Sequence, residues 1–129
     1  MLPLCKQEGI GVIPWSPLAR GYLAREHFDA QSTTRGRTDD FAEHLYTEQR
    51  DAPVIERNAQ VARELGVKPA QVALAWLLGR DSVTAPIIGA SKLEHLDDAI
   101  GALEIELSAE QNAALEEPYQ PHPVLGGLT

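Results

Sequence analysis

The sequence is poor in cysteine and in basic residues, and each shortage removes a class of protein. Its one thiol is Cys5, so no internal disulfide can form, and a reducing, cytoplasmic location is the expectation. Lys and Arg number 11 against 19 Asp and Glu, which gives a formal charge of −8. A surface of that sign repels phosphate backbones and anionic lipids, which argues against nucleic acid or a membrane as the main partner.

The sequence also lacks a hydrophobic run long enough to cross a bilayer, although 43% of its residues are hydrophobic. Its first residues include Lys6 and Glu8 and show no apolar segment followed by a small-residue cleavage site, so a secretory signal is not expected. At 129 residues, the chain has the length of one modest, soluble domain.

Hydrophobic patterning predicts two short strands and several helices. The apolar runs Ile10–Trp15 and Ala85–Ile88 have the composition of buried strands. Between them, Ser16 to Tyr46 is predicted to be a long loop. Helices are expected at residues 3–8, 51–65, 69–78 and 93–103, and from Ser108 onwards, where Ser108 and Gln111 have the spacing of a capping box.

This order of elements indicates an α/β fold, because buried strands that alternate with helices form parallel sheets. Two strands are too few for such a sheet, since each edge needs a neighbour. The sequence therefore predicts two parallel strands with flanking helices that belong to a larger sheet or barrel.

The stretch APIIGASKLEHLDD at Ala85–Asp98 is predicted to run from a strand through a tight turn into a helix. A helix N-terminus attracts anions through its unpaired N–H groups and its dipole. Ser91 is the expected N-cap and a candidate phosphate ligand, and Lys92 adds a positive charge. The arginines of the long loop either form a second part of an anion site or are solvated surface residues; they are Arg20, Arg25, Arg35 and Arg37.

Two motifs, PWSPLARGYL at Pro14–Leu23 and the Ala85–Asp98 stretch, occur in this order around ELGVKPAQVALAWLL at Glu64–Leu78. Together with LEEPYQPHPV at Leu115–Val124, they resemble the aldo-keto reductase family. The resemblance implies a (β/α)8 TIM barrel that binds NADPH at the C-terminal ends of its strands. Residues 1–129 would then be a C-terminal fragment with strands seven and eight, lacking the N-terminal half.

The resemblance also implies roles for individual residues. After strand seven, the cofactor pyrophosphate would lie against Ser16, Pro17, Leu18 and Gly21, and Arg37 would clamp the cofactor, with Arg35 as the neighbouring candidate. After strand eight, the cofactor-binding positions would be Gly89, Ser91, Lys92 on the 2′-phosphate, His95 on the adenosine phosphate and Asp98 near the adenine ribose. For His95 and Asp98 an exposed helix face is the alternative interpretation. Ala99 departs from the asparagine of many relatives.

The family reduces carbonyls with a tetrad of aspartate, tyrosine, lysine and histidine, and no residue here matches that pattern. The expected function is therefore the cofactor-binding part of an NADPH-dependent reductase of aldehydes or ketones, with this chain alone inactive. One alternative is a non-catalytic nucleotide-binding or interaction module that self-associates through exposed strand edges. Another is a truncated reading frame with no function of its own.

Overall fold

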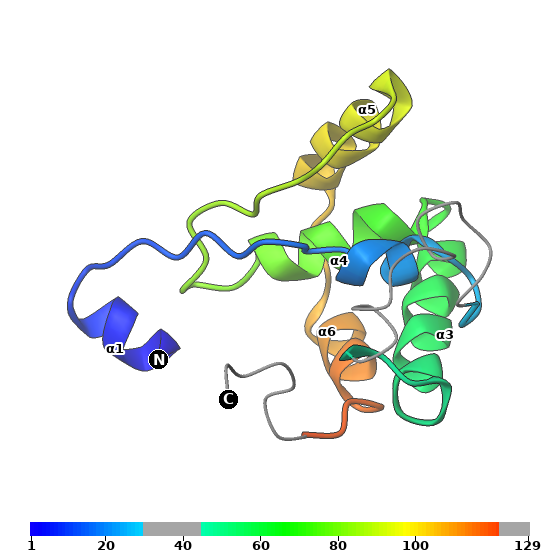
Figure 1. The fold of residues 1–129 in the computed structure, drawn as a ribbon, viewed down its shortest axis with the longest axis horizontal. Coiled ribbons are helices and arrows are strands. Elements are labelled where there is room, and N and C mark those ends of the chain that lie inside the picture. Colours follow the sequence, from blue (N-terminus) through cyan, green and yellow to red (C-terminus); the bar gives the residue numbers. More distant parts are fainter. Residues whose placement is uncertain (30–44, 122–129) are drawn as a thin grey trace.

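The computed structural model describes residues 1–29 and 45–121, and over these ranges the chain is helical (Figure 1). The elements are α1 (Leu2–Gln7), the 3-10 helix η1 (Ala19–Ala24), α3 (Glu48–Leu65), α4 (Pro69–Leu78), α5 (Leu93–Gly101), the 3-10 helix η2 (Ala102–Glu104) and α6 (Ala109–Glu116). Within the described ranges, no helix has both the length and the apolar character that a membrane span requires.

The predicted strands at Ile10–Trp15 and Ala85–Ile88 are wrong for the described residues, which contain no strand and only one isolated parallel bridge, Trp15 with Ile87. The two segments do run side by side in parallel, as the α/β interpretation requires. The N–H of Thr84 donates to the Val12 carbonyl oxygen at 2.8 Å, and the N–H of Ile87 donates to that of Pro14 at 2.8 Å.

Proline explains why this pairing does not become a ladder. In a regular parallel pair, donors on one segment recur every two residues, so the Pro14 carbonyl would receive its bond from residue 86. Residue 86 is a proline without an N–H, and Ile87 donates instead, which shifts the register by one residue. The pairing therefore ends in a single bridge rather than a pair of strands.

The hydrophobic core lies between α3, α4 and α6. Val61, Ala62 and Val72 are almost fully buried, and Leu107 and Leu115 pack against them. The nearly all-apolar sequence of α4 predicts a helix enclosed by neighbours, and this is confirmed, because α4 contacts α3, α5, η1 and η2. The capping box is also confirmed: Ser108 Oγ accepts the Gln111 N–H at 3.2 Å, and Gln111 Oε1 accepts the Ser108 N–H at 2.8 Å.

Two helices at the edges are less enclosed. No residue of α5 is buried, and Leu93 and Ile100 are 79% and 55% exposed. Residues 8–14 separate α1 from the helical group (Figure 1). The side chain of Lys6, on α1, lies 2.9 Å from the Asp81 carboxylate. The segment Ser16–Tyr46, predicted as loop, contains η1, so that expectation is wrong for part of Ala19–Ala24, where Arg20 and Gly21 form a kink with non-helical backbone angles.

Asn58 joins η1 to this core. Its side-chain amide is 3% exposed and donates to the carbonyl oxygens of Leu23 and Pro69, each at 3.0 Å. Leu23 belongs to η1 and Pro69 begins α4, so one side chain of α3 fixes two other elements. A buried carbonyl oxygen without a hydrogen-bond donor costs free energy. The two hydrogen bonds from Asn58 therefore stabilise the position of η1, which follows the turn after Trp15, against α3 and α4.

Replacement of Asn58 by alanine should lower the free energy of unfolding by about 2 kcal/mol, because two carbonyl oxygens lose their donor. Urea titration followed by far-ultraviolet circular dichroism measures this. Gln60→Ala is the matched control, since Gln60 lies on the exposed side of the same helix and its side-chain amide donates to Glu64. Equal stability of the Asn58→Ala variant and the unaltered chain would contradict this role.

Candidate functional site

The turn after Trp15 has an unusual backbone. Ser16, Ala19 and Arg20 have φ angles of 51°, 49° and 56°, which lie in the left-handed region that side chains other than glycine rarely adopt. Each such residue costs about 1 to 3 kcal/mol, and residues of this kind concentrate at ligand sites. Gly21, with φ 97°, is the one position of the turn where a glycine removes that cost.

Hydrogen bonds within the turn hold this conformation. Ser16 Oγ accepts the N–H of Arg20 at 3.1 Å, and the Ser16 carbonyl oxygen accepts the N–H of Ala19 at 3.0 Å. The Leu18 carbonyl oxygen accepts the N–H of Gly21 at 2.8 Å. The Ser16 hydroxyl can still donate its own proton, so it remains able to bind an anion. No heavy atom lies within 4 Å of where a Gly21 Cβ would be, which leaves that face of the turn open.

The buried side chain of Tyr22 fixes the turn to the hydrophobic core. Its ring is 4% exposed and stacks on Phe28 with centroids 4.9 Å apart, while Tyr46 lies against it at 5.2 Å. Ile55 of α3 completes this cluster. Tyr22 is therefore a residue of the hydrophobic core.

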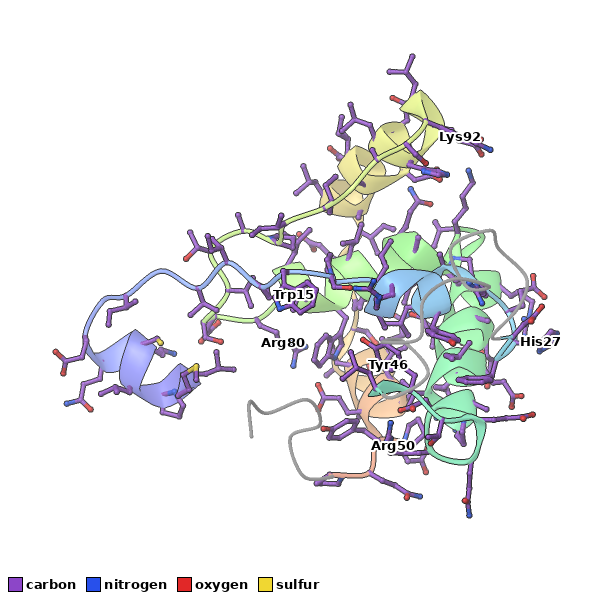
Figure 2. All side chains as sticks on the ribbon, in the orientation of Figure 1. Trp15, His27, Tyr46, Arg50, Arg80 and Lys92 are labelled. Atoms are coloured by element: carbon purple, nitrogen blue, oxygen red, sulfur yellow. The ribbon has the colours of Figure 1, made fainter. Side chains whose placement is uncertain are left out.

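The second turn, Gly89 to Lys92, leads into α5. Ser91 is not the N-cap that the sequence predicts: the N-cap is Lys92, in extended conformation with φ −138° and ψ 151°. Ser91 precedes the N-cap by one residue, and its Oγ is 3.5 Å from Nδ1 of His95. Among the described residues no side chain caps α5, which leaves the amides of Leu93 and Glu94 without a capping side chain, while the His95 N–H donates to the Lys92 carbonyl oxygen at 3.1 Å. Lys92 lies at the end of α5 that is far from the core (Figure 2).

Asp98 is paired with a residue that sequence analysis did not single out. Lys68 Nζ lies 2.8 Å from Glu94 Oε1 and 2.9 Å from the Asp98 carboxylate. Lys68 is the N-cap of α4, and its partners are 26 and 30 residues away, beyond the reach of local patterns. The one signal in the sequence is that Glu94 and Asp98, four residues apart, share a helix face. A cofactor role for Asp98 would have to coexist with this ion pair.

The Trp15–Ile87 bridge brings the starts of the two turns together, since Ser16 follows Trp15 directly and Gly89 is two residues after Ile87. Beyond the bridge, η1 and α5 each pack on α4. Arg37 lies outside the described residues. A surface cavity at the other end of α4, lined by Leu2, Pro3, Lys6, Gly79, Arg80, Asp81 and Ser82, contains none of the predicted site residues.

The ion pair between Lys68 and Glu94 shifts the pKa of both of these groups. The hydrogen bond from Lys68 is the main cause that lowers the pKa of Glu94, and the bond to Glu94 is the main cause that raises the pKa of Lys68. The stabilisation from Glu94 is complete above the pKa of an unpaired glutamate and is lost as pH falls through the lowered value. That from Lys68 is lost as pH rises through its raised pKa.

In a Lys68→Met variant the pKa of Glu94 should rise towards its usual range, because the ammonium that favours the carboxylate is gone. Side-chain carboxyl resonances followed by nuclear magnetic resonance during an acid titration measure this. Glu110, whose lowered pKa arises from its own backbone and Ser108, is the internal control and should not change. An unchanged pKa of Glu94 would contradict the pairing.

The sequence model of the Aldo/keto reductase family matches residues 1–120. A Schizosaccharomyces pombe protein with the provisional name aryl-alcohol dehydrogenase C977.14c is 40% identical over 128 residues, which cover 99% of this chain and 36% of that protein. The versiconal hemiacetal acetate reductase of Aspergillus parasiticus is 37% identical over 130 residues, which cover 98% of this chain and 37% of the reductase.

A solved structure is also similar. The crystal structure of a thermostable aldo-keto reductase in complex with the inhibitor epalrestat superimposes with a TM-score of 0.62 and 26% sequence identity, over 91% of this chain and 32% of that one. The chain thus spans roughly a third of the length of these relatives. With a family match over residues 1–120, the chain belongs to the aldo/keto reductase family.

Proposed function

We propose that this chain is the cofactor-binding, C-terminal part of an aldo-keto reductase that uses NADPH to reduce aldehydes or ketones to alcohols. The observation that supports this most is the Trp15–Ile87 bridge, because it starts two phosphate-type turns at one place. In the proposal the first turn holds the pyrophosphate and the second the adenosine phosphate. Residues 1–129 would contribute the places of strands seven and eight of the barrel, which the segments joined by the Trp15–Ile87 bridge would fill without forming regular strands in this chain alone, and the protein would act in the cytoplasm.

The two turns fit the chemistry of NADPH. In the first, Ser16, Pro17, Leu18 and Gly21 offer a hydroxyl donor and an open backbone face, and Arg37 would add a charge from outside the described residues. In the second, Gly89 leaves space, Ser91 and His95 offer polar side chains, and α5 presents an uncapped N-terminus. NADPH, when bound, would supply the hydride.

In this proposal Lys92 determines the preference of the site for NADPH over NADH. Within the described residues no carboxylate forms an ion pair with its ammonium, which leaves that charge for the 2′-phosphate. A charge-assisted hydrogen bond to phosphate is stronger than a neutral one, so loss of the lysine should weaken binding of the phosphorylated cofactor alone.

Lys92→Met should weaken NADPH binding about tenfold, which corresponds to about 1.4 kcal/mol, and leave NADH binding unchanged. Isothermal titration calorimetry of the full chain measures both. Lys6→Met, which removes the same charge at α1, is the control and should alter neither affinity. An equal loss of affinity for NADPH and NADH would contradict the assignment of Lys92 to the 2′-phosphate. A chain that binds neither cofactor would overturn the proposed function.

The proposal also states that the catalytic tetrad is not in this chain. The burial of Tyr22 argues against this tyrosine as the proton donor, because a proton donor has to reach the substrate carbonyl. Incubation of the chain with NADPH and a reactive aldehyde should therefore give no sustained loss of NADPH absorbance above a no-protein control. Sustained turnover would contradict the absence of the tetrad.

A second candidate function is an interaction module that associates through the paired segments. Its support is the exposure of apolar side chains there: Ile13 and Trp15 are 61% and 65% exposed, and Ile87 is 50% exposed. Surfaces of this kind usually mark contact sites. Sedimentation velocity decides this candidate, because a species that stays monomeric at all concentrations would remove it.

A further inference from the structure

An acidic residue lies beside the groups proposed to hold phosphate. Glu94 directly precedes His95, and the charges of His95 and Lys92 both help to lower the pKa of Glu94, after the larger effect of Lys68. The carboxylate is therefore within the electrostatic reach of both groups. A free Glu94 would compete with an anionic ligand for Lys92 and would repel the ligand itself.

Lys68 supplies the counter-charge for this carboxylate. As the N-cap of α4 it is held at the start of a helix that packs against α5, and its Nζ lies 2.8 Å from Glu94 and 2.9 Å from Asp98. The Lys68 ammonium thus forms ion pairs with two carboxylates of α5. Within the described residues the Lys92 ammonium forms an ion pair with neither of them, and the His95 ring lies within hydrogen-bond distance of the Ser91 hydroxyl, at 3.5 Å.

We propose that Lys68 is a positioning residue of the cofactor site, which holds Glu94 away from Lys92 and His95 and so keeps both available for the adenosine phosphate of a dinucleotide. This inference rests on the proposed function. The anion site would then depend on two helices. The residues that bind the phosphate lie at the start of α5, and the positive charge that keeps them available comes from Lys68 at the start of α4. The competing interpretation is that Lys68 only ties α5 to α4.

Charge removal separates these interpretations. Lys68→Met should weaken NADPH binding about fivefold, in keeping with the modest strength of exposed ion pairs, because Glu94 is released towards Lys92. In the double variant Lys68→Met/Glu94→Gln the competing charge is gone, and NADPH affinity should return to within about twofold of the unaltered chain. If Lys68 only links α5 to α4, that link is still absent in the double variant, and NADPH affinity should stay as low as in Lys68→Met.

Calorimetric titrations with NADPH and NADH, on variants whose helical content is checked by circular dichroism, provide the measurement. Lys6→Met, which breaks the exposed pair with Asp81, is the matched control and should bind as the unaltered chain does. Glu94→Gln alone keeps Lys68 in place and should leave NADPH affinity unchanged or stronger. It also tests the inference should Lys68→Met fail to fold.

The outcomes separate the two proposals. An unaltered chain that binds no NADPH overturns the proposed function and this inference together. If the unaltered chain binds and Lys68→Met binds equally well, the inference alone falls. It also falls if the double variant stays as weak as Lys68→Met, or if Glu94→Gln alone weakens binding.

Discussion

The short parallel pairing between residues 12–15 and 84–87 is the constraint on which the candidate site depends. It joins segments about seventy positions apart in the chain and places the first residues of both turns next to each other. Without it, η1 and α5 would be related only through their separate contacts with α4. Its few hydrogen bonds are supported by the core below, where Asn58 fixes η1 and α4 together.

The same pairing explains the difference between the expected and the observed fold. Apolar runs such as IGVIPW report that a segment is suited to burial, and they say nothing about whether a neighbour is present. Here Ile13 and Trp15 are largely exposed, and Pro86 interrupts the register, so the segments stay irregular.

Local signals predicted the helices well. Pro69 and the apolar run after it mark α4, and Ser108 with Gln111 marks the start of α6, because each depends on residues within one turn. The start of α5 at Leu93 was predicted correctly, but its N-cap was misplaced by one residue, since Ser91 and Lys92 are both compatible with a helix entry and only the backbone angles decide. Lys68 was missed because its partners, Glu94 and Asp98, lie on another helix. The candidate site residues remain predictions, and Arg37 lies outside the described residues.

The central claim is that both turns contribute to one nucleotide site. Backbone amide resonances of the full chain, followed by nuclear magnetic resonance during a titration with NADPH, test it most directly. The account predicts that amides of Ser16–Gly21 and of Gly89–Lys92 shift together and fit one dissociation constant. Shifts confined to one turn, two unrelated constants or no shifts at all would contradict it.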